Sequence, residues 1–355
     1  MQTFIIAEAG VNHSGSVDQA LRLVDAAAEA GADAVKFQSF RADDLVTRTA
    51  AKAEYQERTS DPSESQHAML QGLELPPSAH EALMARARAR GLAFLSTPFD
   101  DVSLEVLTRT LGLSTIKLSS GDVTNAPLLL QTARAASRVL LSTGMSTLAE
   151  VESALGVLAF GFTRPEADEP GVEAFLHAFS RPAGQAALRQ RVTLLHCTSE
   201  YPAPVDEVNL RAMDTLATAF GLPVGYSDHT VGTHVCVAAV ARGACVIEKH
   251  LTLDRRRPGV DQHVSAEPGE LARMVAEIRE IERALGDGVK RPAPSEWKNR
   301  SVARRSLVAK RPIRAGERFD VVCKRPGTGL SPFAYWLVRA RVADRDYEAD
   351  EMVDA

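Results

Sequence analysis

The sequence predicts a (β/α)8 barrel followed by a small second domain, and three observations lead to this prediction. Over residues 1–286, short β-rich runs alternate with helix-like stretches, which is typical of parallel strands joined by helical crossovers. There are eight such runs, the number that a (β/α)8 barrel requires. The chain has 355 residues, which is longer than most domains with a single hydrophobic core, except large α/β barrels. A doubly wound open sheet is the alternative, weakened because no GxGxxG follows the first strand.

The predicted strands are short runs rich in aliphatic and β-branched residues. Helix-like stretches separate them, and three of these end in Gly, which helix C-termini favour. These three stretches are residues 17–31, 78–91 and 207–221. The predicted strands cover residues 4–10, 32–40, 92–99, 115–122, 138–145, 191–199, 223–229 and 245–253.

Two segments interrupt the alternation. Residues 41–76 form a long polar loop after the second strand, on the barrel face where active sites lie. Residues 161–190 extend the fifth βα unit, and we expect an additional helix there.

The alternation of strand-like and helix-like segments stops after residue 286, and the residue composition changes. Residues 287–305 are rich in Pro and basic side chains and are interpreted as a linker. Residues 306–355 show short strands and tight turns, but so small a domain builds only a marginal core. We therefore expect this tail to pack against something larger.

Composition narrows the function classes. Hydrophobic residues make up 45% and charged residues 25%, and a net charge of -5 is spread over interspersed acidic and basic side chains. This composition predicts no nucleic-acid or membrane partner. No apolar run approaches the length of a membrane span and no signal peptide is recognised, so we expect a cytoplasmic enzyme. The four cysteines lack CxxC spacing and are expected to be reduced thiols: Cys197, Cys236, Cys245 and Cys323.

Two consecutive predicted strands end in histidine, His229 in PVGYSDH and His250 in ACVIEKH. Adjacent barrel strands lie about 4.8 Å apart and end on the same face, so the two rings can converge. Such a pair can share a metal ion and leave its other coordination positions open, as in catalytic sites. Asp228 and Glu248 are possible outer partners. The alternative is that each histidine only caps its strand.

The other strand ends are polar as well. Glu8 ends the first strand, Lys36 and Gln38 share one side of the second, and Lys117 lies on the fourth. A buried lysine is costly unless it is paired with an anion. Two such lysines among many hydroxyls predict a site for a small, multiply charged phosphate or carboxylate.

The chain resembles the N-acetylneuraminate (sialic acid) synthase family, which includes legionaminate and pseudaminate synthases. The resemblance spans nearly the whole length, and its ten motifs occur in the family's order. They are AEAGVNHSGS, GADAVKFQSF, STPFD, IKLSSGDVTNAPLL, LSTGMS, LLHCTSEYP, GYSDHT, EKHLTLDR, RPGVDQH and KRPGTGLSP.

The resemblance implies a set of site residues and an assembly. It implies a divalent metal, Mn²⁺ before Mg²⁺, on His229 and His250, and an acid/base carboxylate at Glu8. The resemblance also implies that residues 306–355 form an antifreeze-like (SAF, β-clip) domain, which is swapped between the two subunits of a homodimer. Phosphoenolpyruvate would bind Lys36, Lys117, Ser120, Ser142 and Ser227. An N-acyl hexosamine would contact Gln38, Asp122, Tyr201, Asp261 and, from the partner subunit, Arg325.

The expected reaction joins phosphoenolpyruvate to an N-acyl mannosamine-type sugar and releases phosphate. N-acetylmannosamine is the first candidate, and the diacetamido-trideoxymannose precursor of legionaminate is the second. Two alternatives stay open. One is a metal-free Schiff-base aldolase using Lys36, Lys117 or Lys249, and the other is a non-enzymatic carbohydrate- or ice-binding protein. For Glu8, the alternative role is a structural ion pair with Lys36.

Overall fold

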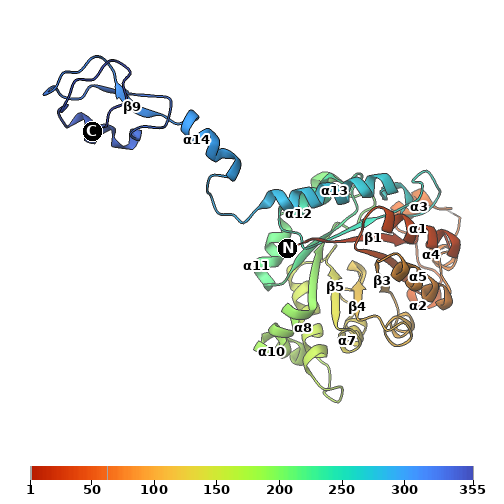
Figure 1. Cartoon of the computed structure of the whole chain (residues 1–355). Coiled ribbons are helices and arrows are strands. Elements are labelled where there is room, and N and C mark those ends of the chain that lie inside the picture. Colours follow the sequence, from red (N-terminus) through yellow and green to blue (C-terminus); the bar gives the residue numbers. More distant parts are fainter. Residues whose placement is uncertain (1, 62, 355) are drawn as a thin grey trace. The chain divides into compact units, whose positions relative to one another are not determined.

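The structure is a computed structural model that describes residues 2–61 and 63–354. The chain divides into two compact units, residues 1–286 and residues 287–355, and each is described by itself. The first unit carries the eight-stranded sheet with its surrounding helices, and the second carries a small sheet (Figure 1).

The first unit is a (β/α)8 barrel, as the sequence predicts. Its eight strands follow the order β3-β2-β1-β8-β7-β6-β5-β4, and the ladders between neighbours are parallel. Strands β3 and β4 stand at the two ends of this order and pack against each other, so the wall is nearly closed. The strands are β1 (Phe4–Gly10), β2 (Ala34–Ser39), β3 (Ala93–Pro98), β4 (Thr115–Leu118), β5 (Arg138–Ser142), β6 (Val192–His196), β7 (Val224–Asp228) and β8 (Val246–His250).

Helices surround the barrel and bury apolar faces against the strands (Figure 1). Helix α1 begins with a Ser16 cap that accepts from the Gln19 amide, and α8 begins with a Thr147–Glu150 capping box. The surrounding helices are α1 (Val17–Glu29), α5 (Pro77–Ala89), α6 (Asp101–Glu105), which continues as the π-helical turn η1 (Val106–Thr110), α7 (Ala126–Ala135), α8 (Leu148–Thr163), α11 (Ala212–Phe220), α12 (His234–Ala241) and α13 (Pro268–Leu285).

Both insertions contain helices. The loop after β2 carries three short helices, α2 (Ala42–Leu45), α3 (Glu54–Thr59) and α4 (Gln66–Gln71). The extension after β5 carries α9 (Val172–Ser180) and α10 (Pro182–Arg191), where the sequence predicts one additional helix. Short 3-10 turns complete this unit: η2 (Ser120–Asp122), η3 (Val205–Glu207) and η4 (Gln262–Val264).

The second unit has its own small core. Antiparallel strands β9 (Ser306–Ala309) and β10 (Val321–Lys324) pair, and Leu307, Ile313, Phe319 and Tyr347 pack around them. This sheet fits the small C-terminal domain that the sequence predicts. Residues 287–305, predicted as a linker, contain a turn and a helix. The remaining elements are η5 (Pro294–Glu296), α14 (Trp297–Ala303), η6 (Pro332–Ala334) and α15 (Tyr335–Arg339).

No helix within the described residues is long and apolar enough to cross a membrane. The four cysteines are free thiols; Cys197 and Cys236 are buried.

The lower interior of the barrel is filled by an apolar layer. Side chains of six strands meet there: Ile6, Ala34, Leu95, Leu140, Leu195 and Val246. Strand β7 contributes Gly225, because a Cβ at this position would lie 2.5 Å from the carbonyl oxygen of Val246 and 2.7 Å from Leu195 Cδ2. This layer supports the polar residues that follow two positions later on most of these strands.

Replacing Gly225 by Ala should therefore destabilise the barrel. We expect a loss of about 3 kcal/mol in the free energy of unfolding, because overpacking displaces backbone and neighbouring side chains. Urea denaturation measures this loss. Gly269→Ala is the matched control, since its Cβ meets open space in helix α13 and should add up to about 1 kcal/mol. Equal effects of both changes would contradict the packing argument.

Candidate active site

A cavity of about 480 Å³ opens above the apolar layer, at the carboxyl ends of the strands. Several of its strand residues lie two positions after a residue of the lower interior, because alternate side chains share one face of a strand. Glu8, Lys36, Thr97, Ser142 and Glu248 follow this rule. The same layer receives Lys117 from β4 and Ser227 from β7. Nearly every strand thus contributes a polar side chain to one space.

Four ionisable groups form the floor of the cavity, and all are at least 96% buried. Lys36 Nζ lies 2.8 Å from Glu8 Oε2 and 3.7 Å from Glu248 Oε2. Lys117 Nζ lies 3.5 Å from Glu248 Oε1, which also accepts a hydrogen bond from Ser227 Oγ at 2.8 Å. Glu248 therefore links the two lysines.

Burial and pairing give these groups different proton affinities. Burial tends to raise the pKa of Glu248, but the ammonium groups of Lys117 and Lys36 hold that pKa at about 2. Burial raises the pKa of Glu8 despite the nearby Lys36. Burial also lowers the pKa of Lys117, whose attraction to Glu248 only partly opposes it. Glu248 is therefore the more strongly ionised of the two floor carboxylates, and Glu8 is the one that takes up a proton more readily.

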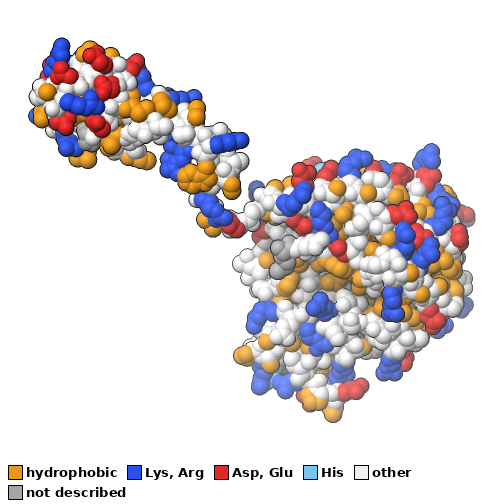
Figure 2. Space-filling view, in the orientation of Figure 1, with side chains coloured by type: hydrophobic (Ala, Val, Ile, Leu, Met, Phe, Trp, Pro, Cys, Tyr) orange, Lys and Arg blue, Asp and Glu red, His pale blue; other side chains and the backbone are white. Residues whose placement is uncertain are grey.

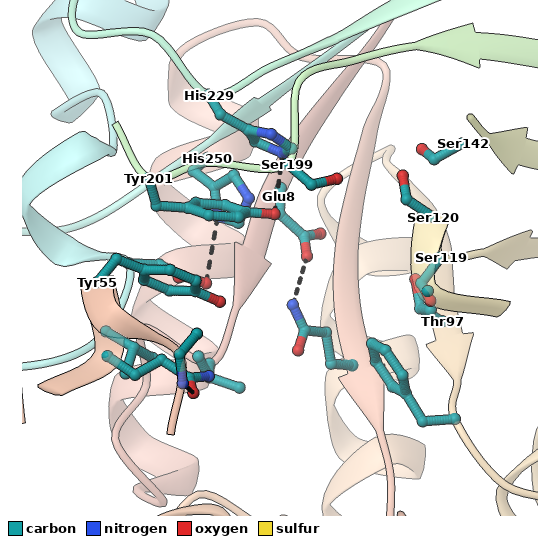
Figure 3. Close-up of a pocket in the computed structure, with 18 of the residues that line it drawn as sticks. Glu8, Tyr55, Thr97, Ser119, Ser120, Ser142, Ser199, Tyr201, His229 and His250 are labelled. Carbon is teal, nitrogen blue, oxygen red and sulfur yellow. Dashed lines mark hydrogen bonds and ion pairs between the residues drawn. The ribbon is translucent and has the colours of Figure 1, made fainter. Parts of the chain in front are cut away.

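The two predicted histidines converge, with ring centroids 5.5 Å apart. In Figure 3, His229 and His250 lie on one side of the cavity, across from Ser119, Ser120 and Ser142. His229 Nδ1 donates to the carbonyl oxygen of Thr198 at 2.6 Å, so a neutral ring presents the lone pair of Nε2. That lone pair accepts from the Tyr201 hydroxyl at 3.2 Å.

His250 has an unused nitrogen. Among the described residues, its Nδ1 has no hydrogen-bond partner, and it lies 3.6 Å from Oδ2 of Asp261. Burial lowers the pKa of both imidazoles. Neutral imidazole is the form that binds metal, so this donor pair fits a divalent cation. Across residues 2–61 and 63–354, no three His, Cys, Asp or Glu side chains are grouped to hold a metal.

One wall of the cavity is apolar. It is built largely by the inserted loop after β2, in which α4 supplies Met69 and Leu70. The wall comprises Val11, Phe40, Met69, Leu70, Leu73 and Val260, and these residues pack in one cluster. Tyr55 of α3 stacks near Tyr201, with ring centroids 4.9 Å apart, and closes the wall toward the histidines (Figure 3).

The structure brings most of the candidate residues to this cavity. Those that line it are Glu8, Lys36, Gln38, Lys117, Ser120, Ser142, Tyr201, Ser227, His229, His250 and Asp261. Asp122 lies outside the lining, and its carboxylate accepts from Ser119 Oγ and from Asn125 Nδ2. Arg325 belongs to the unit of residues 287–355. Lys249 points to the opposite side of β8, where it pairs with Asp228.

Some lining residues were not singled out from the sequence. Glu248 was expected only as an outer partner of the histidines, yet it lies on the cavity floor. Its position two residues before His250 carried the signal, because alternate residues share a face. Thr97 follows the same rule on β3, but no sequence motif marks it as a site residue. Tyr55 lies in the inserted loop, where no strand or helix period marks the inward side chains.

The comparisons agree with the architecture and the motifs. The NeuB family profile matches residues 23–290, three quarters of the chain. The chain belongs to the NeuB family. It is 46% identical to the N,N'-diacetyllegionaminic acid synthase of Campylobacter jejuni over 99% of both chains. It is 43% identical to the enzyme of that name from Legionella pneumophila, over 94% of this chain and 88% of the relative.

A solved NeuB-type structure shares the fold. The crystal structure of N-acetylneuraminic acid (sialic acid) synthetase from Leptospira borgpetersenii, in complex with citrate, is 34% identical with a TM-score of 0.66. The match covers 84% of this chain and 90% of that one. The family resemblance expected from the ten motifs is thereby confirmed.

Proposed function

We propose that this chain is a phosphoenolpyruvate-dependent nonulosonic acid synthase that uses 2,4-diacetamido-2,4,6-trideoxymannose and forms N,N'-diacetyllegionaminic acid. The observation that carries the proposal is one cavity holding two buried lysines, converging hydroxyls and a pair of neutral imidazoles. Anion binding and carbonyl activation are the two functions that this condensation needs.

Phosphoenolpyruvate would bind at the lysine side of the cavity. Lys36, Lys117, Ser120, Ser142 and Ser227 offer ammonium and hydroxyl donors for its phosphate and carboxylate. Within the described residues, the Ser142 hydroxyl is buried without a hydrogen-bond partner, as expected of a donor that a ligand uses. Glu248 lies within 3.7 Å of both lysines and favours their charged forms before an anion arrives.

His229 and His250 would hold a divalent cation, with Mn²⁺ first and Mg²⁺ second, as the family resemblance implies. When bound, the cation supplies Lewis acidity to the aldehyde of the open-chain sugar. The Thr198 carbonyl fixes the metal-binding tautomer of His229. Tyr201 packs 4.2 Å from His229, centroid to centroid, and orders that side of the site.

In the proposed condensation, C3 of phosphoenolpyruvate forms a bond to the aldehyde carbon. Water adds to the resulting cationic C2. The new C2 hydroxyl then becomes the carbonyl as the C–O bond to phosphate breaks, and its proton leaves with the phosphate. The aldehyde oxygen gains one proton and the attacking water loses one. Glu8, with its raised pKa and its position between Lys36 and Gln38, would transfer a proton at these oxygens. Its ion pair with Lys36 is compatible with this role.

The identity of the sugar follows from the relatives and from the apolar wall. The sequence analysis ranked N-acetylmannosamine first, but the 46% and 43% identical relatives favour the legionaminate precursor. The wall of Met69, Leu70 and Leu73 suits the C6 methyl and acetamido methyl groups of that sugar. Gln38, Tyr201 and Asp261 would bind its polar groups. Asp122 would act through Ser119. The Ser119 hydroxyl lines the cavity and donates a hydrogen bond to the Asp122 carboxylate.

The second unit is proposed to act in a domain-swapped homodimer, with Arg325 completing the active site of the partner subunit. Exposed apolar side chains support a docking role for this unit. Phe333 is 99% exposed, Trp336 77% and Leu337 67%. Large exposed hydrophobic groups of this kind mark interaction surfaces. Hydrophobic atoms are visible on this unit in Figure 2.

A substrate panel tests the reaction and the sugar preference. With phosphoenolpyruvate and Mn²⁺, we expect phosphate release and a nine-carbon acid by mass spectrometry. The ratio kcat/KM should favour the diacetamido-trideoxy sugar over N-acetylmannosamine by roughly ten- to a hundred-fold, the discrimination an apolar pocket provides. A preference for N-acetylmannosamine would contradict the sugar assignment. Pyruvate trapped on a lysine by borohydride would instead support the aldolase, and inactivity across the panel would favour a non-enzymatic binding role.

Glu8→Gln tests the proton-transfer role. We expect kcat to fall by roughly a hundred- to ten-thousand-fold, because the amide cannot exchange a proton. Mn²⁺ affinity, followed by titration, should remain within a few-fold of the natural protein, since Glu8 is no proposed ligand. Turnover close to that of the natural protein would leave Glu8 with only its ion-pairing role.

Mixed dimers test the proposed swap. Glu8→Gln and Arg325→Ala are expected to be inactive as separate homodimers. Co-expression with two different tags yields a mixed dimer in which one active site combines an intact barrel with an intact tail. We expect that dimer to regain about half of the natural activity per dimer, assuming independent sites. If Arg325 served its own chain's barrel, the mixed dimer would stay inactive.

A further inference from the structure

A buried ion pair lies on the outer face of the barrel wall, directly behind the two histidines. Asp228 of β7 and Lys249 of β8 are register partners in the parallel ladder. Both side chains are 0% exposed, and Lys249 Nζ lies 2.8 Å from Asp228 Oδ2. Each residue immediately precedes one histidine, His229 or His250, which points into the cavity.

Hydrogen bonds from this pair hold the chain on both sides of His229. Lys249 Nζ also donates to the carbonyl oxygen of Thr230 at 2.5 Å. Thr230 donates to Asp228 Oδ1 from its backbone N at 3.0 Å and from Oγ1 at 2.9 Å. The residues before and after His229 are therefore tied to each other and to the strand that carries His250.

Two more donors complete the surroundings of Asp228. The Tyr226 hydroxyl donates to Oδ1 at 3.0 Å, and Cys236 Sγ of α12 donates to Oδ2 at 3.2 Å. Burial tends to raise the pKa of Asp228, but Lys249 and these hydrogen bonds hold the pKa below its ordinary value. The pair of Asp228 and Lys249 is thus fully buried, and these hydrogen bonds hold it in place.

Such a pair is a poor source of net stability. The desolvation cost of two buried ions is comparable to their attraction, and an apolar pair of similar volume is often equally stable. A directional network specifies position more sharply than apolar packing does. The two histidines need that precision, because N–metal distances near 2.1 Å tolerate only about 0.2 Å of error.

We propose that Asp228 and Lys249 are positioning residues that hold the imidazoles of His229 and His250 at the spacing required to share one divalent cation. The inference rests on the proposed metal site, but it concerns the affinity of that site and not the sugar. The pair acts through the backbone of its neighbours and touches neither substrate nor cation.

The test is Asp228→Asn combined with Lys249→Met in the full-length chain. This double change removes both charges together, so neither is left buried without a partner. Mn²⁺ affinity is measured without substrates from the electron paramagnetic resonance signal of the free ion. We expect the Kd for Mn²⁺ to rise by roughly ten- to a hundred-fold, as for lost outer partners of metal ligands. The melting temperature should change by only a few degrees.

A matched control separates positioning from general loss of stability. Val240 is buried in α12 with 2% exposure and lies outside the pair. Val240→Ala should lower the melting temperature through a small cavity but leave the Kd for Mn²⁺ unchanged. If the double variant does not fold, Thr230→Val removes one donor to Asp228 and keeps the ion pair. Thr230→Val should also raise the Kd for Mn²⁺, but by a smaller factor than the double change.

The outcomes are distinct. A folded double variant, or a folded Thr230→Val where the double variant fails, that binds Mn²⁺ as tightly as the natural chain would overturn the positioning role. A natural chain that does not bind Mn²⁺ would overturn the inference together with the metal site. Because the titration contains neither sugar nor phosphoenolpyruvate, its result stands whether or not the condensation is observed.

Discussion

The alternation of side chains along parallel strands is the constraint on which this site depends. On most of the strands the residue that faces the barrel interior is followed, two positions later, by one that faces the cavity. Ile6 precedes Glu8, Ala34 precedes Lys36, and Val246 precedes Glu248. The apolar residues fill the lower interior of the barrel. The polar residues that follow them therefore lie at one height along the barrel axis. A one-residue shift of β1, for example, would turn Ala7 toward the cavity and Glu8 toward the surrounding apolar core.

Burying four ionisable groups in this layer has a cost that mutual pairing offsets. Glu248 lies between Lys36 and Lys117, and Glu8 pairs with Lys36, so the cluster is close to neutral before ligand arrives. A bound anion would add negative charge to a cluster already balanced. The raised pKa of Glu8 matters here, because proton uptake at this carboxyl group would restore the balance. Under the proposed mechanism, a bound anion would therefore favour the protonated form of Glu8.

Much of this arrangement could be predicted because strand-end residues carry local signals. All eight strands, and the convergence of His229 and His250, followed from short apolar runs and barrel geometry. The roles of Tyr55 and of the Met69–Leu73 segment could not, since the inserted loop has no period that marks its inward face. Asp122 follows a predicted strand, and a 3-10 turn aims its carboxylate at Ser119 and Asn125, a direction that the motif alone does not give. Side-chain direction in a turn depends on tertiary packing that no sequence period encodes.

The two faces of strands β7 and β8 have different functions in the proposed site: the inward face would contact ligands, and the outward face would support the histidines. Ser227, Glu248 and the histidines face inward, where ligands and protons would change their environment during turnover. Asp228 and Lys249 face outward, where helix α12 covers them and no ligand can reach. Groups that exchange partners cannot also define a fixed geometry, because each new partner draws them to a new position. An outward, permanently satisfied ion pair escapes this conflict, so the same alternation that builds the cavity also supplies the rigid support behind it.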